Sequence, residues 1–94
     1  MTIREARRFH AGDMVRPKEK PVNMAITQVT ESADGKSRYF TLDDGRTYVH
    51  RDVNAPAIAI INEPESKWPA DIRKARAWHD ARVAAGLARR PQKP

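Results

Sequence analysis

The sequence predicts a mainly β fold with one α-helix near its C-terminal end, and three observations lead to this prediction. The stretch 36–50 contains two β-rich runs joined by an Asp-Gly pair, which is typical of a tight hairpin turn. Before it, the run 22–30 alternates apolar and polar residues, as half-buried strands do. After it, the residues 69–85 have apolar side chains at helical spacing. We expect about five short strands and one helix.

Length and composition limit what this protein can be. Ninety-four residues suffice for one small domain of limited stability, or one that oligomerisation supports. We expect an N-terminal arm or short helix over 1–11 and a β-barrel over 12–62. A linker and the helix should follow over 63–88, and a disordered basic tail over 89–94.

Several classes of protein are excluded. The chain contains no cysteine, so it has no disulfide and no thiolate nucleophile or metal ligand. No apolar run approaches the roughly 18 residues that a membrane span needs, and the N-terminus lacks the apolar core of a signal peptide. We therefore expect a cytoplasmic protein with no membrane partner.

The net charge of +6 is unevenly distributed along the chain. Residues 1–20 hold six Lys/Arg and three Asp/Glu, residues 21–65 hold four and seven, and residues 66–94 hold eight and two. Basic ends around a mildly acidic middle suggest that the ends contact an anionic partner. A tail that only aids solubility is the alternative.

The N-terminal segment resembles part of a known superfold. Thr2 and Glu5 have capping-box spacing, so a short helix towards His10 is expected, with a frayed arm as the alternative. Beyond it comes a turn and a first strand at 14–16. The pattern Phe-x-x-Gly-Asp-x-Val-x-x-Lys resembles the opening strand of many small SH3-like barrels, including KOW-type and related bacterial domains; its residues are Phe9, Gly12, Asp13, Val15 and Lys18. The resemblance implies an architecture only, because this superfold serves many functions.

The following residues fit such a barrel. The charged segment Pro17–Pro21 should be a loop, since prolines do not donate to a ladder, and in an SH3-like barrel it would be the long first loop, where binding residues often lie. The strand from Val22 to Thr30 should have a bulge or bend near 27–28, because Val29 is out of phase with the earlier apolar residues.

The hairpin should supply much of the core. If Asp44-Gly45 forms a two-residue turn, Phe40, Leu42 and Val49 should be buried. One or both tyrosines of the hairpin, Tyr39 and Tyr48, should then lie at the rim of the core.

The last strand and the helix raise the question of a dimer. After a single 3₁₀ turn near 51–54, the stretch Ala55–Ile61 is apolar on both faces. As a strand, it would need other residues to cover each face. The helix from Pro69 to about Ala85 is the favoured cover, and a homodimer through Ala57–Ile61 or through the helix is the alternative. The docking stripe of the helix consists of Trp68, Ile72, Ala75, His79 and Val83.

The sequence contains no pattern for catalysis or for a cofactor. Its three histidines lack metal-motif spacing, its glycines are isolated, and no nucleophile has an adjacent base. Asp43 and Asp44 precede Gly45 and are explained as turn formers. We therefore expect no enzyme activity, no metal and no cofactor.

Trp78 is the most informative candidate, and it could be exposed or packed against the barrel. Lys74 precedes it by one helical turn and Arg82 follows by one, so the three could stack a base and contact phosphate, or the cations could simply shield the indole. The other candidate binding residues are Arg73, Arg76, Arg89, Arg90, Lys18, Tyr39 and Tyr48. We expect a nucleic-acid-binding module of a small bacterial or phage protein. The alternative is a protein-interaction module, an adaptor or a small inhibitor, with an acidic or apolar partner surface.

Overall fold

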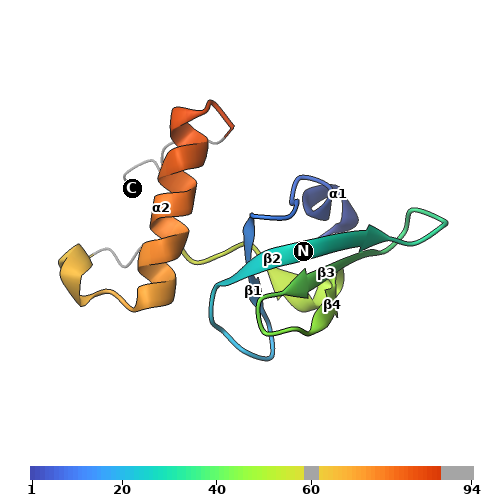
Figure 1. The fold of residues 1–94 in the computed structure, drawn as a ribbon, viewed down its shortest axis with the longest axis horizontal. Coiled ribbons are helices and arrows are strands. Elements are labelled where there is room, and N and C mark those ends of the chain that lie inside the picture. The colour runs from blue at the N-terminus through green and yellow to red at the C-terminus, as the bar shows by residue number, and fades with distance from the viewer. Residues whose placement is uncertain (59–61, 88–94) are drawn as a thin grey trace. The chain divides into compact units, whose positions relative to one another are not determined.

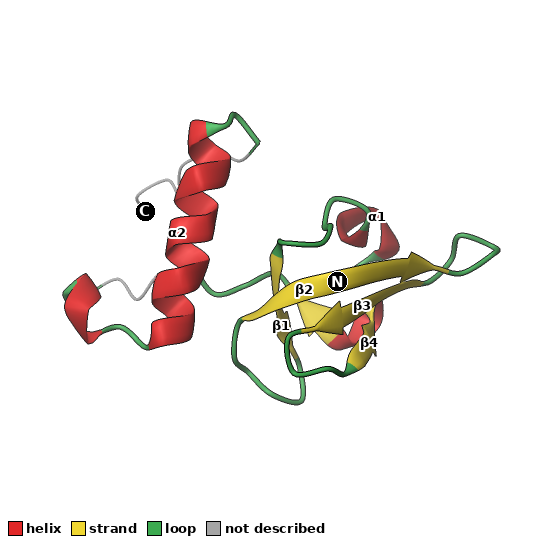
Figure 2. Cartoon of the chain, viewed as in Figure 1, coloured by secondary structure: helices red, strands yellow, loops and turns green. Residues whose placement is uncertain are grey.

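A five-stranded antiparallel sheet and a C-terminal helix make up most of the regular structure (Figures 1 and 2). The computed structural model describes residues 1–58 and 62–87. The strands follow the order β4-β3-β2-β1-β5 across the sheet. This confirms the prediction of a mainly β fold with a C-terminal helix. The elements are α1 (Ile3–Ala6), β1 (Met14–Pro17), β2 (Met24–Glu31), β3 (Arg38–Leu42), β4 (Thr47–Val49), the 3₁₀ turn η1 (His50–Asp52), β5 (Val53–Asn54), the 3₁₀ turn η2 (Glu65–Lys67) and α2 (Ala70–Ala84).

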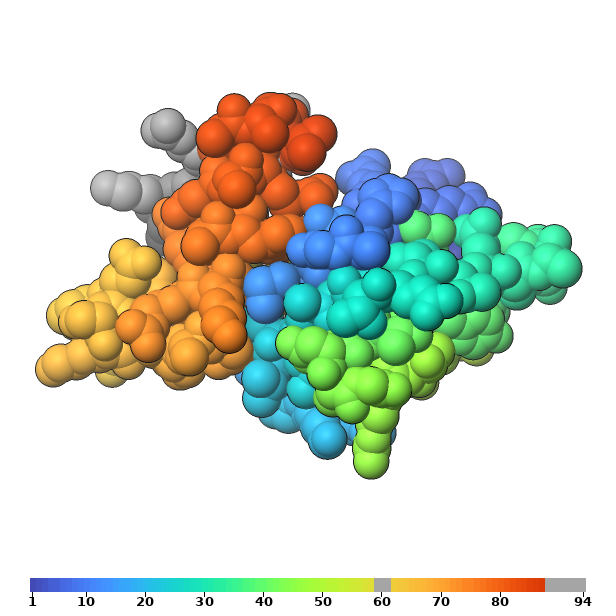
Figure 3. All heavy atoms as spheres, viewed as in Figure 1, coloured from blue at the N-terminus to red at the C-terminus, as the bar shows by residue number. Residues whose placement is uncertain are grey.

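The chain divides into two units, Met1–Ala57 and Ile58–Pro94. The first unit contains the sheet and a core to which every strand contributes. α1 lies over this core (Figure 1), and the β2–β3 turn protrudes from the unit (Figure 3). The core residues are Ala6, Val15, Ile26, Phe40, Leu42, Tyr48 and Val53.

The N-terminal segment is an ordered part of the first unit. The Thr2 hydroxyl accepts a hydrogen bond from the Glu5 amide and donates one to the Glu5 carboxylate, both at 3.2 Å. Thr2 therefore caps the helix as predicted, but the Glu5 carboxylate accepts from the Thr2 hydroxyl and not from the Thr2 amide, as it would in a full capping box. The helix ends at Ala6, earlier than predicted, and Ala6 is completely buried. The frayed-arm alternative is therefore wrong.

The β3–β4 hairpin differs from the prediction by one residue of register. Gly45 donates to the Leu42 carbonyl at 2.9 Å and has a φ of 80°, while no other residue of the turn has positive φ. This is a β-turn followed by a glycine bulge, and not a two-residue turn. Phe40 consequently pairs with Tyr48. A one-residue shift exchanges the faces of a strand, so Tyr48 is buried and Val49 is only half-buried.

Strands β1 and β2 show one predicted irregularity and two corrections. The β2–β3 register shifts between Ile26 and Gln28, which confirms the predicted bulge. β2 begins at Met24, and Val22 lies in the preceding loop, 44% exposed. Pro17, predicted as a loop residue, ends β1 opposite Val53, since a proline is tolerated at the end of a ladder.

The last strand also differs from the prediction. β5 is Val53–Asn54, and residues 55–58 have no regular structure. The Asn23 side chain instead pairs with the backbone of Ala57, accepting from its amide at 2.9 Å and donating to its carbonyl at 2.7 Å. The side-chain amide of Asn23 thus makes the hydrogen bonds that a neighbouring strand would make. The local sequence does not indicate this pairing. The remainder of the expected strand, 59–61, lies outside the described residues.

α2 begins and ends close to the predicted residues. Pro69 precedes its first residue, and Gly86, with a φ of 75°, follows its last turn. Gly86 donates to the Val83 carbonyl at 3.0 Å, and Leu87 donates to the Arg82 carbonyl at 2.8 Å. These two bonds form a Schellman cap, which confirms the predicted role of Gly86.

Candidate functional site

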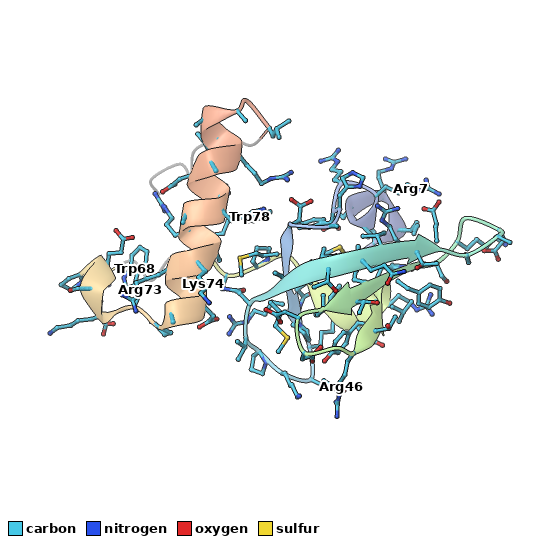
Figure 4. The ribbon with its side chains drawn as sticks, in the orientation of Figure 1. Arg7, Arg46, Trp68, Arg73, Lys74 and Trp78 are labelled. Atoms are coloured by element: carbon cyan, nitrogen blue, oxygen red, sulfur yellow. The ribbon has the colours of Figure 1, made fainter. Side chains whose placement is uncertain are left out.

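The candidate cations of α2 occupy different environments. Arg73 and Lys74 are exposed, and Figure 4 shows both on α2 together with Trp78. Arg76 is half-buried and forms an ion pair with Asp80, four residues later, at 3.0 Å. Within residues 1–58 and 62–87, Arg73 and Lys74 form no such ion pair, and an exposed cation of this kind is the better phosphate ligand, so these two are the stronger candidates.

Trp78 and Arg82 form a direct pair. The Arg82 guanidinium lies over the Trp78 ring, 5.0 Å from its centroid, and both side chains are half-buried. A cation in this position is attracted by the ring's negative face. The Arg82 guanidinium therefore covers one face of the indole, as the shielding alternative predicts. The Arg82 side chain is itself still partly exposed.

The predicted docking stripe contains both buried residues of α2. Ile72 and Ala75 are buried, and Trp68, His79 and Val83 are half-buried. Trp68 also donates its indole N–H to the Glu63 carbonyl at 2.9 Å. This bond ties the Trp68 side chain to the segment before the helix.

A second candidate surface lies on the sheet of the first unit. An open hollow there contains both predicted tyrosines, and Tyr39 is 37% exposed. Tyr39 pairs with Val49 across β3–β4, on the opposite face of the sheet from the core. Glu19, from the loop after β1, and Asp52, from η1, also line the hollow. Its residues are Glu19, Tyr39, Arg46, Thr47, Tyr48, Val49 and Asp52.

Tyr48 lines the hollow, and its hydroxyl is hydrogen-bonded. The hydroxyl donates a 2.8 Å hydrogen bond to the Asp44 carboxylate, which raises the pKa of Tyr48 above its ordinary value. The pKa of Asp44 is lowered, chiefly by the hydrogen bond from the Arg46 amide. Because the Tyr48 ring is buried, only Tyr39 of the two tyrosines offers a ring to a ligand.

Three further candidate residues lie in the loop after β1 or outside the described part of the chain. Lys18 is exposed in the loop after β1, and its amide donates to the Asp52 carbonyl at 2.9 Å. Arg89 and Arg90 lie outside the described residues. The proposed dimer edge Ala57–Ile61 is only partly described, and its described residues are not in a strand.

Arg38, the first residue of β3, has a structural role. Its guanidinium donates to the Phe9 carbonyl at 2.8 Å and lies 3.6 Å from the Glu31 carboxylate. Its backbone N–H donates to Nδ1 of the buried His50 at 3.3 Å. Burial lowers the pKa of His50, and the positive charge of Arg51 lowers it further.

Among residues 1–58 and 62–87, no three histidine or acidic side chains are grouped as metal ligands. None of the helices in that part of the chain is both long and apolar enough to cross a bilayer.

Sequence reasoning missed the two carboxylates of the hollow. Glu19 and Asp52 are distant from Tyr39 in the chain, and only the folding of the sheet brings them to one surface. No local spacing could have indicated this group.

Comparison with protein-family models, with curated proteins and with solved structures finds no match for this chain.

Proposed function

We propose that this protein is a non-catalytic module that binds nucleic acid through the basic surface of α2. One arrangement supports the proposal: Arg73 and Lys74 are exposed about one helical turn before Trp78, which carries the Arg82 guanidinium on its ring. Cations at such spacing can contact successive phosphates, and the Trp78–Arg82 pair can stack against a base. The +6 net charge favours approach to any polyanion.

The first unit fits this role through its architecture. Its strand order, and the 3₁₀ turn between β4 and β5, support the resemblance to a small SH3-like barrel. That superfold includes nucleic-acid-binding and peptide-binding members, so it is compatible with the proposal without selecting it. The lack of cysteine supports a cytoplasmic location.

Fluorescence anisotropy tests the proposal. The full chain is titrated into labelled random-sequence single-stranded RNA, single-stranded DNA and duplex DNA at low salt, and the titration is repeated as salt increases. We expect binding that weakens steeply with ionic strength. If none of the three nucleic acids binds at micromolar protein, the proposal is wrong.

A protein-interaction module is the alternative, and the hollow beside Tyr39 is the observation that favours it. Pull-down from lysate with and without nuclease treatment separates the two functions, because a protein partner survives nuclease. Light scattering on the purified chain tests for a homodimer through α2.

A further inference from the structure

The N-terminal segment of the first unit carries basic residues outside the proposed α2 surface. α1 and the turn after it contain Arg4, Arg7 and Arg8, and all three are exposed. Arg7, which Figure 4 shows beside α1, donates to the Gly35 carbonyl at 3.0 Å and lies 3.7 Å from the Glu31 carboxylate. The side chains of Arg4 and Arg8 form no ion pair or hydrogen bond with another residue of 1–58 or 62–87. An anionic ligand can therefore reach them without displacing a described partner.

Packing holds Arg4 and Arg8 in place on the first unit. Ala6 is completely buried and Ile3 packs against the core, so the other side of α1 faces solvent. The backbone stays ordered after the helix, where the Arg8 amide donates to the Glu5 carbonyl at 3.0 Å. Cations on such an ordered backbone lose less conformational entropy on binding than cations on a loose tail.

The charges around α1 do not cancel these two arginines. α1 contacts η1, and Arg7 reaches the β2–β3 turn. Residues 1–13, 31–38 and 50–52 together hold six Lys/Arg and five Asp/Glu, and both the Met1 ammonium and the nearby Lys18 add positive charge. Among the described residues none of the five carboxylates forms an ion pair with Arg4 or Arg8; they belong to Glu5, Asp13, Glu31, Asp34 and Asp52. This end of the first unit is therefore positive and favours an anion.

The guanidinium groups suit phosphate in particular. A guanidinium presents a planar set of N–H donors that can bind two phosphate oxygens at once. We propose that Arg4 and Arg8 form a second contact surface, on the first unit, for the phosphate backbone of the nucleic acid that α2 binds. This inference rests on the proposed function and extends it, because it gives each of the two units a part in binding.

Salt-dependent fluorescence anisotropy on the full chain tests this inference. The double variant Arg4→Gln/Arg8→Gln is titrated into single-stranded RNA, single-stranded DNA and duplex DNA as salt increases. We expect the slope of log K against log salt to fall by about 1.4 on a single strand or about 1.8 on a duplex, the value of two phosphate contacts. An unchanged slope would overturn the inference and leave binding by α2 intact. Failure of the unaltered chain to bind any of the three would overturn both the inference and the proposed function.

Two further variants separate phosphate contact from other effects. Arg46→Gln/Arg76→Gln lowers the net charge equally, but its cations already pair with carboxylates at 3.1 and 3.0 Å, so the slope should change little. Arg4→Lys/Arg8→Lys retains both charges and should keep the slope. An equal loss in the Arg46→Gln/Arg76→Gln control would show an effect of net charge alone, and an equal loss in the lysine variant would show that charge is not what Arg4 and Arg8 supply. Either result would overturn the inference.

Combined variants test whether both surfaces bind at once. Replacing Arg4, Arg8, Arg73 and Lys74 together by glutamine should lower the slope by about 2.8 to 3.6, the sum of the two double variants. A loss no greater than that of the Arg73 and Lys74 variant alone would overturn the inference.

An acidic protein is the other occupant to be tested. The ¹⁵N-labelled full chain is titrated with single-stranded DNA and with polyglutamate at equal concentrations of charge. We expect the DNA to shift the amide signals of Arg4 and Arg8 more strongly, because carboxylates on a flexible polypeptide lack the phosphate geometry. Equal or larger shifts with polyglutamate would assign this surface to acidic proteins and overturn the inference.

Discussion

Tyr48 lies directly opposite Phe40 in the β3–β4 ladder, and both rings are buried in the core of the first unit. Gly45 sets this pairing, because its left-handed conformation adds one residue to the turn between the strands. The same turn places the Asp44 carboxylate 2.8 Å from the Tyr48 hydroxyl, which donates a hydrogen bond to it. One turn thus determines which side chain of β4 enters the core.

Gly45→Ala should destabilise the protein by about 1–2 kcal/mol, the usual cost of a left-handed conformation for a residue with a Cβ atom. No atom lies within 4 Å of the position that the new Cβ would take, so the effect isolates backbone strain. Urea unfolding measures it. Gly45→Asn should lose less stability, because asparagine tolerates this conformation better. Equal stability of Gly45→Ala and the unaltered chain would contradict the assigned turn.

Asp44→Asn should lower the pKa of Tyr48 towards 10.0. The hydrogen bond to the charged carboxylate is the main cause of the raised pKa, and burial is the second cause, so part of the shift should remain. NMR titration of the tyrosine ring signals resolves Tyr48 from Tyr39. Asp43→Asn, on the neighbouring turn residue, is the control. An unchanged Tyr48 pKa in Asp44→Asn would show that the hydroxyl does not bond to Asp44.

Folding stability should fall as the pH is lowered from about 6.5. Burial holds the pKa of His50 below 6.5, so in this range the unfolded chain binds a proton that the folded chain does not. Well above pH 6.5 His50 is neutral in both states and contributes no slope. Urea unfolding should show a smaller loss between pH 7 and lower pH for His50→Gln, which does not titrate. Identical pH profiles for the two proteins would contradict this prediction.

Replacing Arg73 and Lys74 together by glutamine should reduce the salt dependence of nucleic-acid binding. Each phosphate contact contributes about 0.7 to 0.9 to the slope of log K against log salt, so the double variant should lose about 1.4 to 1.8. Arg76→Gln is the matched control, because Asp80 already neutralises that cation at 3.0 Å. An equal loss of slope in both variants would place the binding surface elsewhere.

Sequence analysis located the candidate residues of α2, and it missed the composition of the hollow. Lys74, Trp78 and Arg82 recur at four-residue spacing, and helical geometry alone brings such residues together. Tyr39, Glu19 and Asp52 have no such spacing. Their proximity depends on the strand pairing and on the loop after β1, so no periodic pattern could indicate it.

Local chemistry in the sequence by itself determined the fold class, the bulge in β2 and the cap at Gly86. Each of these depends on neighbouring residues, such as a change of hydrophobic phase or a glycine after a helix. Only the tertiary structure decided that Tyr48 and not Val49 is buried, and that the Asn23 side chain pairs with Ala57 in place of a longer last strand. The physical reason is that strand register and side-chain-to-backbone pairing are selected by the packing of the whole core, where a one-residue shift exchanges every inward-facing side chain.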